Sequence, residues 1–242
     1  MTKVIKIGVG LMNIYNKKSK KKLVLVAVIP AYNEAKFISK VILNAQKYVD
    51  KVIVIDDGST DDTQEIARKS GAIVYRNENN IGKWFALKRG FYLALEMEAD
   101  IVITLDGDGQ HNPHEIPEFL NALLNGADVA IGVRKYKGKM PLIRKVSNYL
   151  TTTIINSLFS LMISDSQCGY RAYSRKALKD LEISSEGYEG ETESIIRLGK
   201  TALTIEEVPI QTLYGVESSK MSTVRDTWRF LKTVFSMKIK GF

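Results

Sequence analysis

The sequence predicts an α/β fold, in which a single domain has a mostly parallel central sheet covered by helices on both faces. Two observations predict it. Apolar runs of β-rich composition alternate with segments of helical periodicity between residues 23 and 131. The β-rich runs are almost continuously apolar, which is typical of parallel strands whose two faces are both buried.

The first strand is expected at residues 23–29, where the apolar run stops at Pro30. Residues 35–49 then place apolar side chains at helical spacing, and residues 52–55 form a second strand-like run that ends at Asp56. The alternation continues in the same way. The elements expected next are a helix at 61–70 followed by Gly71, a short strand at 73–75, a helix at 83–97, a strand at 101–105, a helix at 114–125 closed by Gly126, and a strand at 129–131.

The second half of the chain is less regular. Residues 142–163 carry a broad apolar stripe at helical spacing, and residues 224–236 carry a second stripe with basic residues between the apolar positions. A further strand is expected at residues 202–208. Each stripe has two interpretations, a helix packed on the core or an amphipathic helix lying in a membrane interface.

Composition and charge limit the classes of protein. The single cysteine, Cys168, excludes an internal disulfide, and no apolar run reaches the ~18–20 residues that span a bilayer. The net charge of +8 is unevenly distributed, because three segments hold much of the positive charge. These are residues 1–22 with seven lysines and no acid, 134–145 with six basic residues and no acid, and 220–242 with six basic residues and one acid. Such segments suit nucleic acid or anionic lipid as a partner.

Polar, turn-forming clusters follow three of the first four strand-like runs, at residues 30–34, 56–60 and 106–110. In open α/β sheets, ligands bind beyond the carboxyl ends of the strands. We therefore expect the three clusters to converge on one site.

The last of these clusters, Asp106-Gly107-Asp108, is the most informative. It delivers two carboxylates at the end of an apolar strand, where an unpaired charge is costly. A hard divalent cation would offset that cost, and such a cation typically brings the phosphates of a ligand with it. The alternative is an ordinary acidic turn, because Asp and Gly are common turn residues.

The remaining polar residues fit a nucleotide. Glu34 could hold the hydroxyls of a ribose, and the cluster that begins at Asp56 offers acceptors for a nucleobase. Lys83 stands at an expected helix start, where phosphate binds well, but for Lys83 taken alone a simple surface lysine is the favoured interpretation. The sequence contains neither Gly-x-Gly-x-x-Gly nor a Walker A motif, which removes the main support for a dinucleotide site or a P-loop.

Taken together, these residues resemble family 2 glycosyltransferases, and within them the dolichyl-phosphate mannose synthase group. The motifs that carry the resemblance are Pro30-Ala-Tyr-Asn-Glu34, Asp56-Asp-Gly-Ser59, Asn80-Ile-Gly-Lys83, Asp106-Gly-Asp-Gly-Gln-His111, Gly132-Val-Arg134, Asp165-Ser-Gln-Cys-Gly-Tyr-Arg171, Glu191-Thr-Glu193 and Glu207-Val-Pro-Ile210 through Ser219-Lys220. It covers about residues 24–236. Two features depart from that group: Asp-Gly-Asp-Gly replaces the Asp-Ala-Asp-Leu often seen there, and the given sequence ends at Phe242, whereas many relatives continue into transmembrane helices.

The resemblance implies a single Rossmann-like GT-A domain, a GDP- or UDP-sugar donor, and Mg²⁺ or Mn²⁺ as cofactor. It implies a metal site of Asp106, Asp108 and Gln110. It implies a nucleotide-sugar site of Pro30, Tyr32, Glu34, Asp57, Ser59, Lys83, Asp106 and Gly107. GDP-mannose is the favoured donor, followed by UDP-glucose and a UDP-N-acetylhexosamine.

The expected chemistry follows from charge. A divalent ion would stabilise the leaving diphosphate as a Lewis acid. Candidate binders of the acceptor phosphate are Arg134, Arg144, Arg171 and Lys220, and the candidate catalytic residues are Asp108, Arg134, Arg144, Asp165 and Glu191. A lipid phosphate is already ionised and needs no base, whereas a hydroxyl acceptor would need Asp165 or Glu191 as a base. The alternative for Asp165, Glu191 and Arg171 is an internal salt-bridge network.

The sequence thus predicts an inverting hexosyltransferase that moves mannose or glucose to a polyprenyl or dolichyl phosphate. We expect it in the cytoplasm, peripheral on the cytosolic membrane face through helices 142–163 and 224–236, with a membrane-anchored partner or a second copy as a possible companion. The chain would comprise a basic extension (1–22), a GT-A domain (23–219) with a donor half (23–135) and an acceptor half (136–219), and a basic amphipathic helix (220–242). One alternative is transfer to a hydroxyl of a glycan or glycolipid. A remote one is a non-catalytic nucleotide- or nucleic-acid-binding protein, which leaves the Asp106 and Asp108 pair unexplained.

Overall fold

The computed structural model describes residues 22–134, 142–181, 189–211, 223–239 and 241. The expected basic extension, apart from Lys22, and the expected phosphate binder Lys220 lie outside the described residues. Arg144 lies in the first turn of a helix, and its side chain is outside the described part of the structure.

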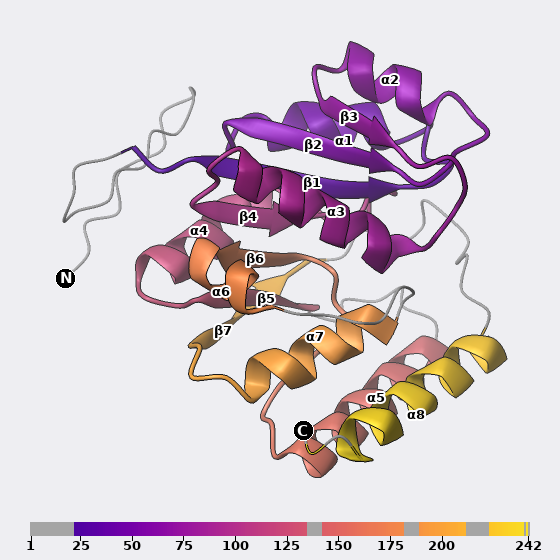
Figure 1. Ribbon diagram of the computed structural model, residues 1–242, viewed down its shortest axis with the longest axis vertical. Helices are drawn as coiled ribbons and strands as arrows, with labels where there is room; N and C mark the ends of the chain where they lie inside the picture. Colours follow the sequence, from indigo (N-terminus) through magenta and orange to yellow (C-terminus); the bar gives the residue numbers. More distant parts are fainter. Residues whose placement is uncertain (1–21, 135–141, 182–188, 212–222, 240, 242) are drawn as a thin grey trace.

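A seven-stranded sheet forms the centre of the described molecule (Figure 1). Its strands are β1 (Leu25–Ala31), β2 (Lys51–Asp56), β3 (Ile73–Arg76), β4 (Ile101–Thr104), β5 (Val129–Arg134), β6 (Arg171–Ser174) and β7 (Ile205–Ile210), in the spatial order β3-β2-β1-β4-β6-β5-β7. Neighbouring strands are parallel except at β6, which runs antiparallel to both β4 and β5. The predicted α/β class with a mostly parallel sheet is confirmed, and β6 is the strand that the periodicity did not predict.

Helices cover both faces of the sheet, as the apolar strands predicted. They are α1 (Ile38–Ala45), α2 (Thr63–Lys69), α3 (Lys83–Glu96), α4 (Ile116–Leu124), α5 (Leu142–Phe159), α6 (Arg175–Asp180), α7 (Glu189–Gly199) and α8 (Thr223–Ile239), with a short 3₁₀ turn, η1 (Pro113–Glu115), before α4. Alternate residues of β1 enter two separate cores, Leu25 and Ala27 with α1 and α4, and Val26 and Val28 with α3, α5, α7 and α8.

We expected the first strand to stop at Pro30, but in the structure it continues past this residue. Pro30 pairs with Ile55 of β2, and β1 continues to Ala31. The ladder between β1 and β4 ends at Val28, so one side of β1 is already unpaired when the chain reaches the proline. A proline without an N–H is tolerated at such a position.

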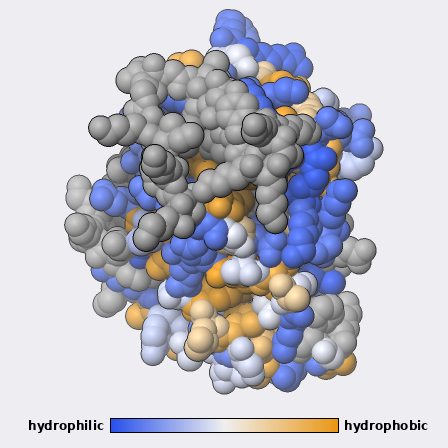
Figure 2. Space-filling view, turned by 90° about the vertical axis from the view of Figure 1, so that its left-hand side faces the viewer, coloured by the Kyte–Doolittle hydropathy of each residue, from blue (hydrophilic) through white to orange (hydrophobic). Residues whose placement is uncertain are grey.

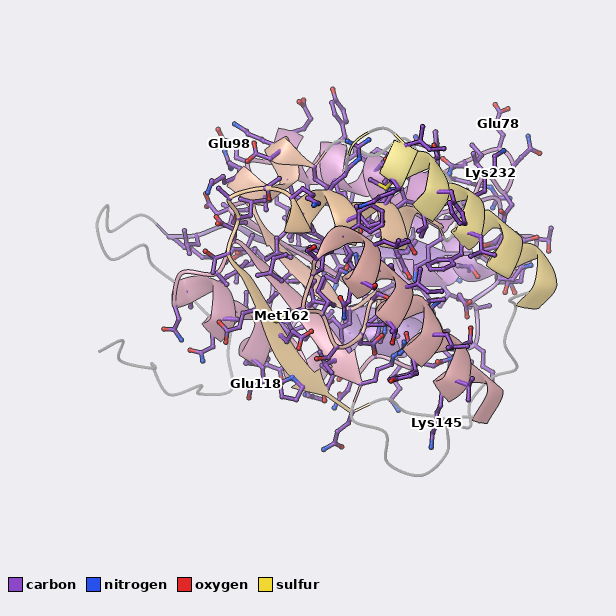
Figure 3. The ribbon with its side chains drawn as sticks, turned by 90° about the horizontal axis from the view of Figure 1, so that it is seen from below. Glu78, Glu98, Glu118, Lys145, Met162 and Lys232 are labelled. Atoms are coloured by element: carbon purple, nitrogen blue, oxygen red, sulfur yellow. The ribbon has the colours of Figure 1, made fainter. Side chains whose placement is uncertain are left out.

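Helices α5 and α8 lie side by side at one end of the molecule (Figures 1 and 3). Large apolar side chains remain exposed on or next to them, namely Val146, Tyr149, Leu150, Met162, Leu231, Phe235 and Ile239. Figure 2 shows hydrophobic residues gathered in the lower part of one face, near the region in which both helices end in Figure 1. In the described part of the chain, no helix combines the length and apolar character needed to cross a bilayer.

Candidate active site

The three polar clusters converge, as predicted, because β2, β1 and β4 are neighbours and end at the same edge of the sheet. The backbone N–H of Asn33 donates to Ser59 Oγ at 2.9 Å, and the N–H of Thr60 donates to Asn33 Oδ1 at 2.8 Å. Gly107 approaches the first cluster so closely that an added Cβ would lie 3.3 Å from Glu34 Cγ. Two residues expected to bind the nucleotide sugar lie around this edge. Pro30 is buried in β1, and the side chain of Tyr32 is partly exposed.

Asp57 is buried and shapes one wall of this edge. Its carboxylate accepts hydrogen bonds from Asn77 Nδ2 at 2.7 Å, from the N–H of Ile81 at 3.2 Å and from the N–H of Gly82 at 2.8 Å. Asp57 therefore fixes the segment that leads into α3. Gly58 next to it has φ +77°, and an added Cβ would lie 2.7 Å from the backbone of Asn79, so only glycine fits the turn.

Lys83, the first residue of α3, joins two acids from distant parts of the chain. Its Nζ lies 2.7 Å from Asp106 Oδ1 at the end of β4 and 2.8 Å from Glu191 Oε1 at the start of α7. Gly169 makes this approach possible, because a Cβ there would lie 2.8 Å from Lys83 Nζ and 2.9 Å from Glu191 Oε1. The interpretation of Lys83 as a simple surface residue is wrong, since its side chain is only 19% exposed.

The charges of these groups depend on each other. Burial alone would raise the pKa of Asp106, but the Lys83 ammonium and further positive groups hold it at about 2. Burial likewise opposes the charge of Lys83, and the two carboxylates raise its pKa in spite of it. The pKa of Asp108 is raised, first by burial and then by the charge of Asp106. The edge therefore holds an ionised Asp106–Lys83 pair beside a second carboxyl group, Asp108, that binds protons more readily.

The residues fit a divalent cation that is held jointly with a ligand. No cluster of three or more His, Cys, Asp or Glu side chains in the described ranges could hold a metal by itself. Asp106 and Asp108 supply two carboxylates, and the Gln110 N–H donates to Asp108 Oδ1 at 2.9 Å, which fixes the turn between them. Mg²⁺ is commonly bound by one or two carboxylates together with substrate phosphates. Asp106, Asp108 and the Gln110 amide oxygen would hold Mg²⁺ or Mn²⁺ in this way.

A stack of rings supports this loop from behind. His111 is buried, its Nδ1 accepts a hydrogen bond from the N–H of Asp106 at 3.1 Å, and its ring stacks on Tyr170. Tyr170 stacks in turn on Phe119 of α4 and donates its hydroxyl to the carbonyl of Asn112. Burial lowers the pKa of His111 in spite of the nearby carboxylates. The sequence singled out His111 only as the last residue of the Asp106–His111 motif, and in the structure its ring supports the loop that carries Asp106 and Asp108.

Arg134 and Asp165 form a two-pronged ion pair next to this edge. Arg134 Nε lies 2.7 Å from Asp165 Oδ2, and Nη2 lies 2.8 Å from Oδ1. Asn148 Nδ2 on α5 donates to the same carboxylate at 3.2 Å, and Asp165 is 1% exposed. This geometry agrees with the salt-bridge interpretation of Asp165 and not with a base that faces an acceptor.

Arg171, expected at the acceptor phosphate, is buried inside the protein. Its Nε donates to the carbonyl of Cys168 at 2.7 Å, Nη1 donates to Ser194 Oγ at 2.7 Å, and Nη2 donates to the carbonyl of Ser166 at 3.2 Å. The guanidinium thus makes its hydrogen bonds to the loop before β6 and to α7. The expectation that Arg171 binds a phosphate of the acceptor does not hold in this structure, in which Arg171 links the carbonyls of Ser166 and Cys168 to Ser194 on α7.

A mostly parallel α/β sheet whose carboxyl edge gathers carboxylates, a buried lysine and glycine turns is an arrangement in which ligands bind beyond the strand ends. The sequence model described as glycosyl transferase family 2 matches residues 26–182. The chain therefore belongs to glycosyl transferase family 2, and it is a glycosyltransferase. The family expected from the motifs is confirmed.

Individual relatives agree. The UDP-N-acetylglucosamine–dolichyl-phosphate N-acetylglucosaminyltransferase of Methanococcus voltae is 35% identical over 221 residues, which cover 81% of this chain and 88% of that protein. The dolichyl-phosphate hexose transferase of Haloferax volcanii is 32% identical over 195 residues, covering 77% and 81%. Glucosyl-3-phosphoglycerate synthase from Mycobacterium tuberculosis, solved with Mn²⁺, UDP-glucose and phosphoglyceric acid, matches with a TM-score of 0.72 at 25% identity, covering 89% of this chain and 80% of that one. The expected GT-A-like fold is thereby confirmed.

Proposed function

We propose that the protein is a metal-dependent, inverting hexosyltransferase that moves a sugar from a nucleoside-diphosphate donor to a polyprenyl or dolichyl phosphate. The observation that carries the proposal is the carboxylate pair of Asp106 and Asp108 beside the Lys83 ammonium at the carboxyl edge of the sheet. The names of the relatives from Methanococcus voltae and Haloferax volcanii, both of which include dolichyl phosphate, support this acceptor.

The donor would bind across the ends of β2, β1 and β4. Its nucleoside would lie against the loop that Asp57 holds, near Tyr32, Glu34 and Ser59. Its diphosphate would meet Asp106, Asp108 and Gln110 through the cation, with Lys83 at the phosphates. Mg²⁺ or Mn²⁺, when bound, would supply Lewis-acid stabilisation of the negative charge that develops on the leaving diphosphate.

A phosphate is the acceptor that fits the site best, because both candidate bases are already paired with basic side chains. Asp165 is paired with Arg134, and Glu191 is paired with Lys83. A phosphate is ionised at neutral pH and needs positioning rather than a base. Arg134 would provide it from the end of β5, with Arg144 and Lys220 as further proposed contacts. Transfer to a hydroxyl would instead need one of the two acids to leave its partner.

A polyprenyl or dolichyl acceptor resides in a membrane, and α5 and α8 carry exposed apolar side chains that could contact its surface. Two of their exposed apolar residues, Val146 and Leu231, are adjacent in sequence to Lys145 and Lys232, which are labelled in Figure 3. An apolar helix face flanked by basic residues is suited to the interface of an anionic bilayer. We propose that these helices rest on the cytosolic membrane face and bring the acceptor phosphate to Arg134.

A transfer assay tests the proposal. The protein is incubated with Mn²⁺, dolichyl phosphate in phosphatidylglycerol-containing vesicles, and labelled GDP-mannose, UDP-glucose or UDP-N-acetylglucosamine in separate reactions. We expect one donor to give an organic-soluble, acid-labile glycolipid. NMR should show that its anomeric configuration is inverted relative to that of the donor sugar. No glycolipid from any donor, together with glycosylation of a soluble alcohol, would contradict the lipid acceptor.

A further inference from the structure

The ammonium of Lys83 forms an ion pair with the Asp106 carboxylate, which is also a proposed ligand of the divalent cation. Its Nζ lies 2.7 Å from Asp106 Oδ1, which is hydrogen-bonding distance. A divalent cation bound to the same carboxylate would come within a few ångströms of the ammonium. Two positive charges at such a separation repel each other, and burial makes the repulsion stronger than in water.

Glu191 gives Lys83 a second partner in the same place. Glu191 Oε1 lies 2.8 Å from Lys83 Nζ, and its side chain is only 10% exposed. Lys83 can therefore keep a full negative partner when Asp106 turns to another cation. Without Glu191, Asp106 would be the one carboxylate paired with Lys83 among the described ion pairs.

The position of Glu191 is fixed by tight contact between the first turns of α3 and α7. An added Cβ at Gly190 would overlap the Trp84 ring, and one at Gly169 would meet Lys83 and Glu191 together. Arg171 Nη1 binds Ser194 one turn further along α7. The seat of the ammonium is thus built from three separate segments, and neither glycine leaves room for a side chain.

We propose that Lys83 opposes metal binding at Asp106 until a nucleoside diphosphate arrives, and that Glu191 is the positioning residue that retains Lys83 when Asp106 passes to the metal. The inference rests on the proposed function and goes beyond it, because it makes metal binding depend on the donor. The diphosphate adds negative charge that attracts both Lys83 and the cation, so the two cations no longer compete for one carboxylate alone.

Mn²⁺ binding without turnover tests the role of Lys83. Free Mn²⁺ is counted by electron paramagnetic resonance during titration of the full chain with MnCl₂, with and without UDP or GDP. We expect wild type to bind Mn²⁺ weakly unless nucleotide is present, and Lys83→Met to bind Mn²⁺ alone at least tenfold more tightly. Lys176→Met is the matched control, because Lys176 pairs with Asp128 just before β5, at the opposite edge of the sheet. It should bind Mn²⁺ as wild type does.

A double-mutant cycle tests the role of Glu191. Glu191→Gln leaves Lys83 with Asp106, so we expect Mn²⁺ binding to weaken severalfold with or without nucleotide. In the Lys83→Met background the same substitution should have little effect. An equal loss in both backgrounds would show a general effect of charge and would overturn the positioning role. Glu65→Gln, which breaks an exposed Lys69 pair on α2, is the control.

The outcomes separate the two proposals. If Lys83→Met binds Mn²⁺ alone no more tightly than wild type, while UDP or GDP still promotes binding to wild type, the role of Lys83 is wrong and the donor site stands. If wild type binds no Mn²⁺ with either nucleotide, the proposed function fails. Should Lys83→Met not fold, Lys83→Gln replaces it, because its amide removes the positive charge and can still donate a hydrogen bond to a neighbouring carboxylate. Mn²⁺ binding by Lys83→Gln must then tighten, and an unchanged affinity overturns the inference.

Discussion

Arg134 binds both carboxylate oxygens of Asp165, Nε to Oδ2 at 2.7 Å and Nη2 to Oδ1 at 2.8 Å. A bidentate pair of this kind fixes the plane of the guanidinium as well as its position. Asp165 comes from the loop after α5, so the pair ties the end of β5 to the half of the protein that carries the proposed membrane helices. Under the proposed function, Asp165 would be the residue that positions Arg134 for the acceptor phosphate.

Asp165→Asn should therefore act on the acceptor. The amide keeps the shape of the side chain and removes the charge, so Arg134 loses its partner. We expect the KM for dolichyl phosphate to rise about tenfold, which corresponds to ~1.4 kcal/mol, with the affinity for UDP or GDP unchanged. Glu118→Gln, an exposed acid on α4, is the control. A collapse of kcat at an unchanged acceptor KM would mean that Asp165 is a base.

The exposed apolar face of α5 and α8 makes a prediction about vesicles. Phe235→Ser and Leu150→Ser together should reduce co-sedimentation with phosphatidylglycerol vesicles, because they remove apolar surface that would enter the interface. Raising the salt concentration should weaken binding further through the basic residues. Tyr92→Ser removes an equally exposed ring from α3 and is the control. Equal binding by the double variant and wild type would contradict membrane contact through these helices and favour a partner protein or a second copy.

Glu115 gives a prediction about pH. Burial raises its pKa, Oε1 accepts from the N–H of Gln211 at 2.7 Å, and Oε2 is buried with no hydrogen-bond partner in the structure. A carboxyl group whose pKa is raised on folding stabilises the fold below its unfolded pKa and loses that contribution as pH rises through the folded value. Glu115→Gln should thus raise the Tm by about 1–3 °C at pH 7 and change it little at pH 4. A lower Tm of Glu115→Gln at pH 7 would contradict the inference that burying the ionised Glu115 carboxylate destabilises the fold.

Gly90 tests how closely α3 packs on the sheet. A Cβ at this position would overlap the side chain of Val28 on β1. Gly90→Ala should lower the free energy of unfolding by about 1–3 kcal/mol, although alanine favours helices, because overpacking outweighs propensity. Chemical denaturation measures it, with Tyr92→Ala on the outer side of the same helix as control. A stabilised Gly90→Ala protein would show that α3 lies further from β1.

The convergence of the polar clusters could be predicted from sequence, because it follows from local patterns. Apolar runs define the strands, and parallel strands bring their carboxyl ends to one edge. The pattern therefore predicts that Asp106 and Asp108 follow a strand at this edge, and in the structure they follow β4 there. Gly71 and Gly126, expected after helices, do have positive φ values of 84° and 112°.

The roles of Asp165, Arg171 and Glu191 could not be predicted in the same way, because their partners are distant in sequence. β6 has four residues and no apolar alternation, so only its pairing with β4 and β5 defines it. Arginine is rarely buried, and nothing in the order of residues shows that carbonyls of Ser166 and Cys168 surround Arg171. Gly169, which allows Lys83 to reach both acids, had a signal only as part of the Asp165–Arg171 motif.

The most direct test of the whole account is calorimetric titration of the intact protein with Mn²⁺ in the presence of UDP or GDP, compared with Asp108→Asn. We predict stoichiometric binding with one of the two nucleotides, and a loss of at least a hundredfold in Asp108→Asn, while Asp180→Asn on α6 binds as wild type does. Equal Mn²⁺ affinity in Asp108→Asn and wild type would contradict the claim that this carboxylate pair holds the cation of the donor.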